Sequence, residues 1–356
     1  MNNIYYTKES QFIDFTNRLK KDYTTFAPVK KEYPSKAADY NFERVLPTDT
    51  TPIIFNEYRT VQPLKAFFTH PSEVASQYFN PEDKAIDLGK TIIFGVKSCD
   101  IYGHRIQDFV FLEGVDVDQL YRVRRENIIF ISSDCTGFKN VCHCLAWDVL
   151  PYPTEKFDLN LSVLNDGFLV EVGSPAGQQL IDANKDCFVK ARDVQIAARA
   201  VKRENLIEKL RRHLLPQNLV SPDKVQQIVK AGYAAQTWKD FMQTCVECGG
   251  CNLICDTCHC FLLSDAKCGQ QNQKVKVWDS CLYANYARVA GGANPLKTRA
   301  QRLRNRFMKK FDFFVDNMGI PACCGCGRCI EVCPGKIDIR EVLKDLEAKT
   351  KDMANS

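Results

Sequence analysis

Short apolar runs rich in β-branched and aromatic residues recur through the first half of the chain and predict strands. Five such runs cover residues 51–58, 90–96, 126–133, 158–165 and 167–174. The last two are joined through Asp166 and Gly167, a pair that favours a tight hairpin turn. We therefore expect residues 1–190 to form a mixed α/β domain.

The pattern changes to helical spacing at about residue 195. Pro216 ends a first helical segment, and Ser221 with Pro222 provides a cap and first turn for the next. The apolar positions of the first segment are Val201, Leu206, Leu210 and Leu214. We expect residues 191–235 to form a helical linker.

A further helix is expected to begin at Asn294 and Pro295 and to end at Gly319. Its apolar face consists of Leu296, Ala300, Leu303, Phe307, Phe311 and Phe314, which follow one another at steps of three or four. Residues 338–352 predict a short amphipathic helix. Because strand signals are sparse here, we expect residues 236–356 to form an all-helical domain and the whole chain to be an α+β protein.

The composition is that of a globular protein, and a length of 356 residues suggests about two domains. The apolar runs are strand-sized, well short of the roughly 18 residues that span a bilayer. The N-terminus lacks the basic and apolar regions of a signal peptide. We therefore expect a cytoplasmic chain that does not span the membrane.

The chain contains 18 cysteines, and 13 of them lie between Cys245 and Cys333. Thiols stay reduced in the cytoplasm, where dense clusters bind metal more often than they form disulfides. The formal charge of +5 is mild and ignores the negative charge of metal-bound thiolates. It therefore gives no reason to expect a nucleic-acid partner.

Two cysteine motifs share the spacing C-x2-C-x2-C-x3-C. In two-cluster ferredoxins, this spacing gives three thiolates to one 4Fe-4S cluster and the fourth to the other cluster. The sequence therefore predicts two clusters. The first is ligated by Cys245, Cys248, Cys251 and Cys333, and the second by Cys255, Cys323, Cys326 and Cys329.

Zinc is the alternative metal, but a four-ligand zinc site does not explain the third and fourth cysteines of each motif.

Two positions depart from the usual pattern. Asp256 follows Cys255 where proline is common, and Cys324 is an extra thiol beside Cys323. Neither departure removes a ligand, and the Asp256 carboxylate is expected to lower the potential of the cluster that Cys255 ligates.

A second group of cysteines follows two predicted strands in the N-terminal half. Parallel strands that end side by side would bring Cys99 close to Cys135, and Cys142 and Cys144 would close the site from a loop. Four thiols that converge in this way predict a third 4Fe-4S cluster. The alternatives are a structural zinc, or a reactive Cys99 beside Asp100 with the other thiols merely buried.

Other thiols have no clear ligand role. Cys258, Cys260 and Cys281, with His259 and Cys268 nearby, are interpreted as packing near a cluster or, alternatively, as a further metal site or redox-active thiols. Cys187 has no evident partner. The basic run 297–310 is either a solvated helix face or a group of cations that raise cluster potentials or dock an acidic partner.

No phosphate-binding glycine-rich loop, dinucleotide fingerprint or nucleophile elbow occurs in the sequence. The chain therefore has no recognisable flavin or nucleotide site.

The chain resembles the iron–sulfur electron-transfer subunits typified by the beta subunit of sulfhydrogenases and by the related iron–sulfur subunit of anaerobic sulfite reductases. The resemblance extends from about residue 62 to residue 343. Its markers are "FGVKSCDI", "LYRVRREN", "DCTGFKNVCHC", "CVECGGCNLICDTCHC", "WDSC", "AGGANP", "RLRNRF" and "CGCGRCIEVCP". It implies ligand roles for the eight C-terminal motif cysteines, and its cysteines include Cys99, Cys135, Cys142 and Cys144.

This resemblance implies a non-catalytic subunit of an anaerobic oxidoreductase complex. It would relay electrons between a flavin-containing partner, linked to NAD(P)H or ferredoxin, and a catalytic subunit such as a hydrogenase or a sulfite or sulfur reductase. Two other functions stay open at this point. One is a catalytic thiol or iron–sulfur subunit that acts on a sulfur or disulfide substrate, and the other is a zinc-stabilised interaction protein.

Overall fold

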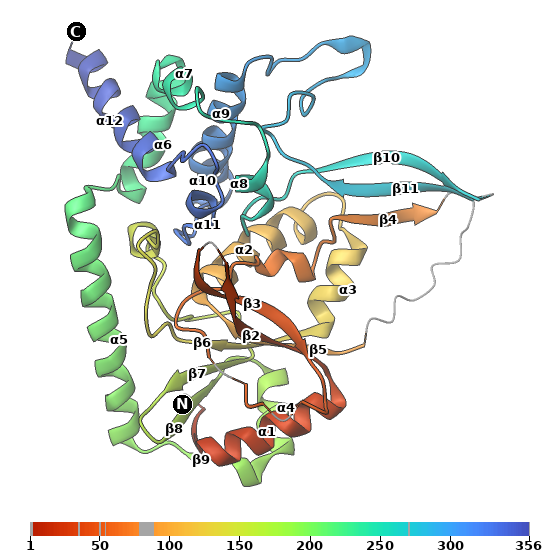
Figure 1. Ribbon diagram of the computed structural model, residues 1–356, viewed down its shortest axis with the longest axis vertical. Coiled ribbons are helices and arrows are strands. Elements are labelled where there is room, and N and C mark those ends of the chain that lie inside the picture. The colour runs from red at the N-terminus through yellow and green to blue at the C-terminus, as the bar shows by residue number, and fades with distance from the viewer. Residues whose placement is uncertain are drawn as a thin grey trace.

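The computed structural model describes residues 3–34, 36–49, 51–53, 55–77, 89–269 and 271–355. Figure 1 shows a strand-rich region near the N-terminus, a helical region that contains the C-terminus, and a narrow arm of strands projecting to one side. Within the described residues, no helix is long and apolar enough to span a membrane.

The main sheet contains eight strands among the described residues, in the order β3-β2-β5-β6-β7-β8-β1-β9. Strands β2, β5, β6 and β7 run parallel to their neighbours in that order, and the remaining pairs are antiparallel. The strands are β1 (Ile4–Lys8), β2 (Thr24–Tyr33), β3 (Lys36–Val45), β5 (Thr91–Val96), β6 (Ile128–Ser133), β7 (Leu159–Val163), β8 (Gly167–Val172) and β9 (Val189–Lys190).

Both faces of this sheet are covered by helices, because alternate residues of its central strands point to opposite sides. Ile92 and Phe94 of β5 pack with Phe12 of α1, whereas Ile93 packs with Phe111 of α2. The covering helices are α1 (Glu9–Asp22) and α4 (Pro175–Ala183) on one face, and α2 (Ser98–Leu112) and α3 (Gln119–Asn127) on the other. The mixed α/β character expected of the N-terminal part is confirmed.

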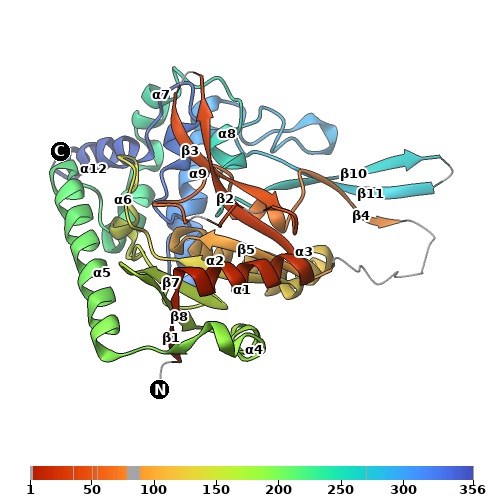
Figure 2. The ribbon, with the colours of Figure 1, turned by 60° about the horizontal axis from the view of Figure 1, so that its bottom comes forward.

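Helix α5 (Asp193–Leu214) runs along one side of the molecule from the sheet to the helical region, as Figures 1 and 2 both show. The helices of the helical region pack around a second hydrophobic core, which includes Trp238, Phe307 and Phe311. The helices here are α6 (Pro222–Ala231), α7 (Thr237–Phe241), α8 (Gly250–Leu253), α9 (Arg299–Met308), α10 (Phe314–Met318), α11 (Arg328–Glu331) and α12 (Ile339–Asn355), with a π-helical turn at Lys309–Phe313.

The expectation of an all-helical C-terminal part is wrong. Strands β10 (Phe261–Cys268) and β11 (Gln271–Trp278) form a hairpin between the two cysteine motifs, and β4 (Ser72–Gln77) pairs with β11. Apart from the Phe-Leu-Leu start of β10 their sequences are largely polar, and the third strand comes from a part of the chain about 200 residues away. The local strand signal is therefore weak, and the pairing itself is non-local.

Two smaller expectations also differ from the structure. The described residues of segment 51–58 form no strand, although Ile53 and Phe55 pack against the sheet core. Helix α9 begins after Thr298 rather than at Asn294, because the Thr298 hydroxyl accepts a hydrogen bond from the Gln301 amide. Asn294 instead forms a turn with the amide of Leu296.

The N-terminal and C-terminal parts are in direct contact at Gly103 of α2. A Cβ atom at Gly103 would lie 2.4 Å from the Cβ atom of Asp256. Such a distance is too short for two carbon atoms, so this helix approaches the first cysteine motif closely only because residue 103 has no side chain.

We expect Gly103→Ala to lower the free energy of unfolding by about 1–3 kcal/mol, the usual cost of overpacking. The measurement is the midpoint of anaerobic chemical denaturation. Gly114→Ala is the matched control, because the nearest atom to its added Cβ is 3.6 Å away. Equal midpoints for the two variants would show that the contact is not tight.

Candidate metal centres

A first group of thiols surrounds one cavity at the start of the C-terminal part. Cys245, Cys248, Cys251 and Cys333 line it together with Cys329. The backbone amide of Glu247 donates to the Cys245 sulfur at 3.4 Å, and that of Ile337 donates to the Cys333 sulfur at 3.3 Å. Burial raises the pKa of Cys245, and the hydrogen bond from the Glu247 amide opposes that shift.

Left-handed backbone conformations shape the loop around this cavity. Glu247 and Gly249 have φ angles of 56° and 70°. A Cβ at Gly249 would lie 2.7 Å from the Tyr283 hydroxyl, so glycine is required there for both conformation and space. The tight turns between Cys245 and Cys251 direct three thiols toward one point.

The second group joins the two motifs. Burial raises the pKa of Cys329, and the negative charges of Cys255, Cys323 and Cys326 add to that effect. Burial also raises the pKa of Cys323, to about 11, with Cys255 and Cys326 again among the contributing charges. Cys255 of the first motif thus lies among three thiols of the second.

The third group is in the N-terminal part. Strands β5 and β6 are parallel neighbours, and Cys99 and Cys135 follow their C-terminal ends. These two thiols line one cavity together with Cys142 and Cys144 from the next loop. Burial raises the pKa of Cys135 to about 12, and the positive charge of Lys97 opposes that shift.

The three groups adjoin one another. Cys329 belongs to the second group and also lines the cavity of the first group. Cys326 belongs to the second group and also lines the cavity of the third group. The loops touch as well, because the His143 amide donates to the Gly325 carbonyl at 2.8 Å. The thiol groups therefore form a continuous series through the protein.

Three cations of the basic run 297–310 are buried, and two of them, Arg306 and Lys310, lie against these thiols. Arg302, Arg306 and Lys310 lie on one side of α9 and the following turn, and each is at most 5% exposed. Lys310 Nζ lies 3.4 Å from the Cys255 sulfur. For these three residues the interpretation as a solvated helix face is wrong, although Arg299 is exposed.

Arg306 provides a test of whether the first cavity suits an anionic group. Its Nε atom donates to Asn252 Oδ1 at 2.8 Å. Its buried Nη2 atom has no hydrogen-bond partner among the described residues, and the side chain lines the cavity with Cys251 and Cys329. An unpaired guanidinium donor facing thiols fits a negatively charged iron–sulfur cluster.

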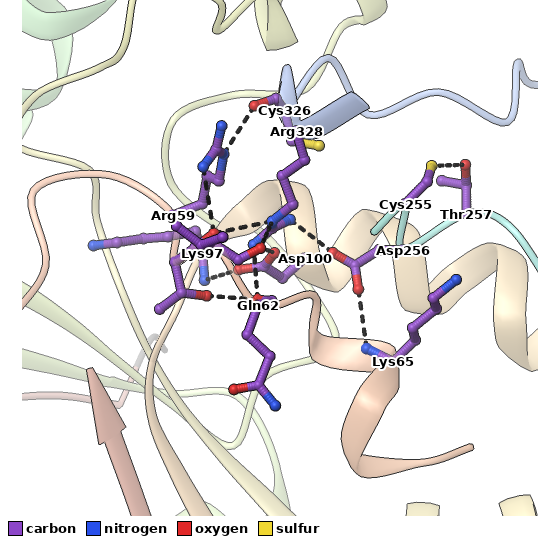
Figure 3. A network of polar contacts seen from close by, with 12 residues as sticks. Arg59, Gln62, Lys65, Lys97, Asp100, Cys255, Asp256, Thr257, Cys326 and Arg328 are labelled. Carbon is purple, nitrogen blue, oxygen red and sulfur yellow. Dashed lines mark hydrogen bonds and ion pairs between the residues drawn. The ribbon is translucent and has the colours of Figure 1, made fainter. Parts of the chain in front are cut away.

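Asp256 is fully buried and forms an ion pair with Arg328 at 2.8 Å. Arg328 also pairs with Asp100 at 2.7 Å, and Figure 3 shows it between the two carboxylates. Burial disfavours the charged form of Arg328, yet the two aspartates raise its pKa well above the usual range. Asp256 therefore joins the two motifs to the N-terminal part, and its effect on a cluster potential stays a prediction.

Sequence reasoning missed several buried polar residues of this region. Arg59 donates to the Cys326 carbonyl at 3.0 Å and pairs with Glu331. Lys65 donates through Nζ to the carbonyls of Asn252 and Cys258, each at 3.0 Å. Neither side chain belongs to a periodic pattern or a motif, so no local signal identifies it.

The remaining thiols lie at different places. Cys324 packs with Cys99 and Cys326, and Cys258 interacts with Cys255. Cys260 and Cys281 interact with each other, whereas Cys187 lies in the core of the main sheet. The side chain of Cys268 is outside the described residues. Within the described residues, no three Cys, His, Asp or Glu side chains are arranged to hold a single metal ion.

We expect Arg328→Met to lower the free energy of unfolding by about 3–5 kcal/mol, because it leaves two buried carboxylates without a counter-charge. Asp256→Asn should cost less, about 1–3 kcal/mol, because Arg328 keeps Asp100 as a partner. Anaerobic chemical denaturation of both variants measures the difference. A larger loss for Asp256→Asn would contradict this account of the ion pairs.

Comparison with known proteins supports the same picture. A family model described as a 4Fe-4S dicluster domain matches residues 244–337, and such a domain holds two 4Fe-4S clusters. The sulfhydrogenase 2 subunit beta of Pyrococcus furiosus is 30% identical over 337 residues, which cover 94% of this chain and 96% of that protein. The resemblance expected from the motifs is confirmed: the chain belongs to the family of iron–sulfur proteins that includes the sulfhydrogenase beta subunits.

Proposed function

We propose that this protein is an electron-transfer subunit that conducts electrons through three adjacent iron–sulfur clusters. The observation that carries the proposal is the sharing of thiols between neighbouring groups. Cys329 connects the first group with the second, and Cys326 connects the second with the third. Clusters held by these groups would be near neighbours, as one-electron relay requires.

The proposed ligands are those expected from the spacing of the motifs. One cluster is held by Cys245, Cys248, Cys251 and Cys333, and a second by Cys255, Cys323, Cys326 and Cys329. A third is held by Cys99, Cys135, Cys142 and Cys144. This assignment is supported by the grouping of the thiols around common cavities and by their mutual electrostatic interactions.

The clusters supply reversible one-electron chemistry, and the protein controls where and at what potential it occurs. Buried Arg306 and Lys310 offset the negative charge of the thiolates, which favours the reduced state. Apolar side chains such as Leu303 and Ile339 cover the first cavity and restrict water. No residue of this relay needs to bind a substrate.

A conducting subunit requires an electron donor and an electron acceptor. The relative from Pyrococcus furiosus is by its name one subunit of a larger enzyme. By analogy, we propose that this chain assembles in the cytoplasm with a flavin-containing partner linked to NAD(P)H or ferredoxin. A catalytic redox subunit, such as a hydrogenase or a sulfur or sulfite reductase, would be the second partner.

Anaerobically purified protein should contain about twelve irons per chain, four for each of three clusters. We expect Cys135→Ser to reduce the iron content to about eight, with the electron paramagnetic resonance signals of the two remaining clusters unchanged. Cys187→Ser is the control, because Cys187 lies in the sheet core. About eight irons in the unaltered protein would contradict the third cluster, and zinc without iron would overturn the whole proposal.

Lys310→Met should lower the potential of the cluster ligated by Cys255, because a nearby cation stabilises the added electron. A unit charge at ~7 Å with an effective dielectric near 20 contributes about 2.4 kcal/mol, or roughly 100 mV. Redox titration followed by electron paramagnetic resonance measures the shift. Lys310→Arg keeps the charge and should keep the potential, and equal potentials for Met and Arg would show that the cation has no such role.

A further inference from the structure

Cys260 and Cys281 are brought together by the hairpin of β10 and β11, which the sequence did not predict. Phe261 pairs with Trp278 at the base of the hairpin, and the ladder continues because the Asp279 amide donates to the Cys260 carbonyl at 2.9 Å. Cys281 follows Asp279 by two residues, so the hairpin places the Cys281 thiol close to the Cys260 thiol. Each of the two thiols shifts the pKa of the other.

The environment of the two thiols is unequal. Cys260 is partly exposed and lines a pocket with Lys65, Lys276 and Trp278. Cys281 is only 3% exposed, and its sulfur lies 3.1 Å from Asn252 Nδ2. An incoming molecule can therefore reach one sulfur of the pair more easily than the other.

Polar groups stabilise the negative charge on the accessible sulfur. Lys309 Nζ lies 3.9 Å from Cys260 Sγ, and the Tyr286 hydroxyl lies 3.6 Å from it. Lys309 and Tyr286 are also hydrogen-bonded to each other. Lys309 and Lys310 are the first two residues of the π-helical turn and reach different thiols, since Lys310 contacts Cys255.

These contacts separate the acidities of the two thiols. The Cys281 thiol donates to Cys260, and this bond lowers the pKa of Cys260 to about 5 despite burial, with help from Lys309 and Tyr286. Asp279 acts in the opposite direction. The same bond raises the pKa of Cys281 well above its usual value. A thiolate beside a protonated thiol is the arrangement that thiol–disulfide exchange uses.

We propose that Cys260 and Cys281 form a redox-active dithiol that reduces small disulfides, with Cys260 as the attacking thiolate and Cys281 as the resolving thiol. This site is distinct from the proposed relay, because neither residue belongs to the three groups of candidate ligands. The substrate class is a low-molecular-weight disulfide that reaches the partly exposed Cys260 sulfur.

The chemistry is a two-electron exchange in two steps. The Cys260 thiolate attacks one sulfur of the disulfide, which forms a mixed disulfide and releases one thiolate. Cys281 then loses its proton and attacks Cys260, which forms the Cys260–Cys281 disulfide and releases the second thiolate. One disulfide is reduced to two thiols while the protein dithiol is oxidised, and an added dithiol such as dithiothreitol then reduces the Cys260–Cys281 disulfide again and is itself oxidised.

The test uses anaerobic protein with its clusters in place and glutathione disulfide as the probe. We expect release of two glutathione molecules per chain and an internal disulfide, located by mass spectrometry of the peptides that contain Cys260 and Cys281. Absorbance of the clusters is followed throughout, so loss of iron is distinguished from thiol oxidation.

Single variants separate the two roles. Cys281→Ser should trap one glutathione on Cys260 and slow release of the second at least tenfold. Cys260→Ser should form no mixed disulfide, and Cys187→Ser should behave as the unaltered protein does. The proposal would be overturned if the second glutathione were released at the same rate with and without Cys281. It would also be overturned if the protein held a stoichiometric metal that is lost in both Cys260→Ser and Cys281→Ser.

The pH dependence gives an independent readout. Cys260 should react with iodoacetamide at a constant rate above about pH 6 and more slowly as the pH falls through about 5, because protonation removes the thiolate. Lys309→Met should move this midpoint to higher pH, whereas Lys309→Arg should restore it. A midpoint near the ordinary thiol value in the unaltered protein would contradict the role of Cys260.

Discussion

Arg328 lies between the carboxylates of Asp100 and Asp256, and all three side chains are fully excluded from solvent. Asp100 follows Cys99 at the start of α2, Asp256 follows Cys255 of the first motif, and Arg328 lies within the second motif. The guanidinium group also donates to the carbonyls of Thr60 and Val61. One buried cation therefore connects the elements that present all three thiol groups.

The free energy of these buried ion pairs depends on different factors from that of a surface ion pair. Each charge has lost its hydration, so the arrangement is stable only while its partners are present and well aligned. Fixed partners also restrict how far the thiol groups can move relative to one another. The ion pairs thereby contribute geometric precision to a region whose cavities would otherwise be lined mainly by sulfur and apolar side chains.

Several cationic side chains lie beside the thiols. Arg306 and Lys310 lie one helical turn apart, and the consecutive residues Lys309 and Lys310 contact Cys260 and Cys255 respectively. One short segment thus serves both the proposed electron relay and the proposed dithiol. The unpaired Nη2 atom of Arg306 in the first cavity is consistent with the same principle, because a buried guanidinium donor is costly without an acceptor.

The sequence by itself determined the local features: the spacing of the two cysteine motifs, the β-branched runs of the central strands and the helix that ends at Gly319. Motif spacing is informative because ligands separated by two residues reach one cluster through local backbone turns. Contacts between segments that are distant in the sequence were decided only by the tertiary structure. The burial of Asp256 against Arg328, the pairing of β4 with β11, and the meeting of Cys260 with Cys281 all join residues with no shared periodicity. No local pattern encodes such contacts, because they form only when the whole chain packs.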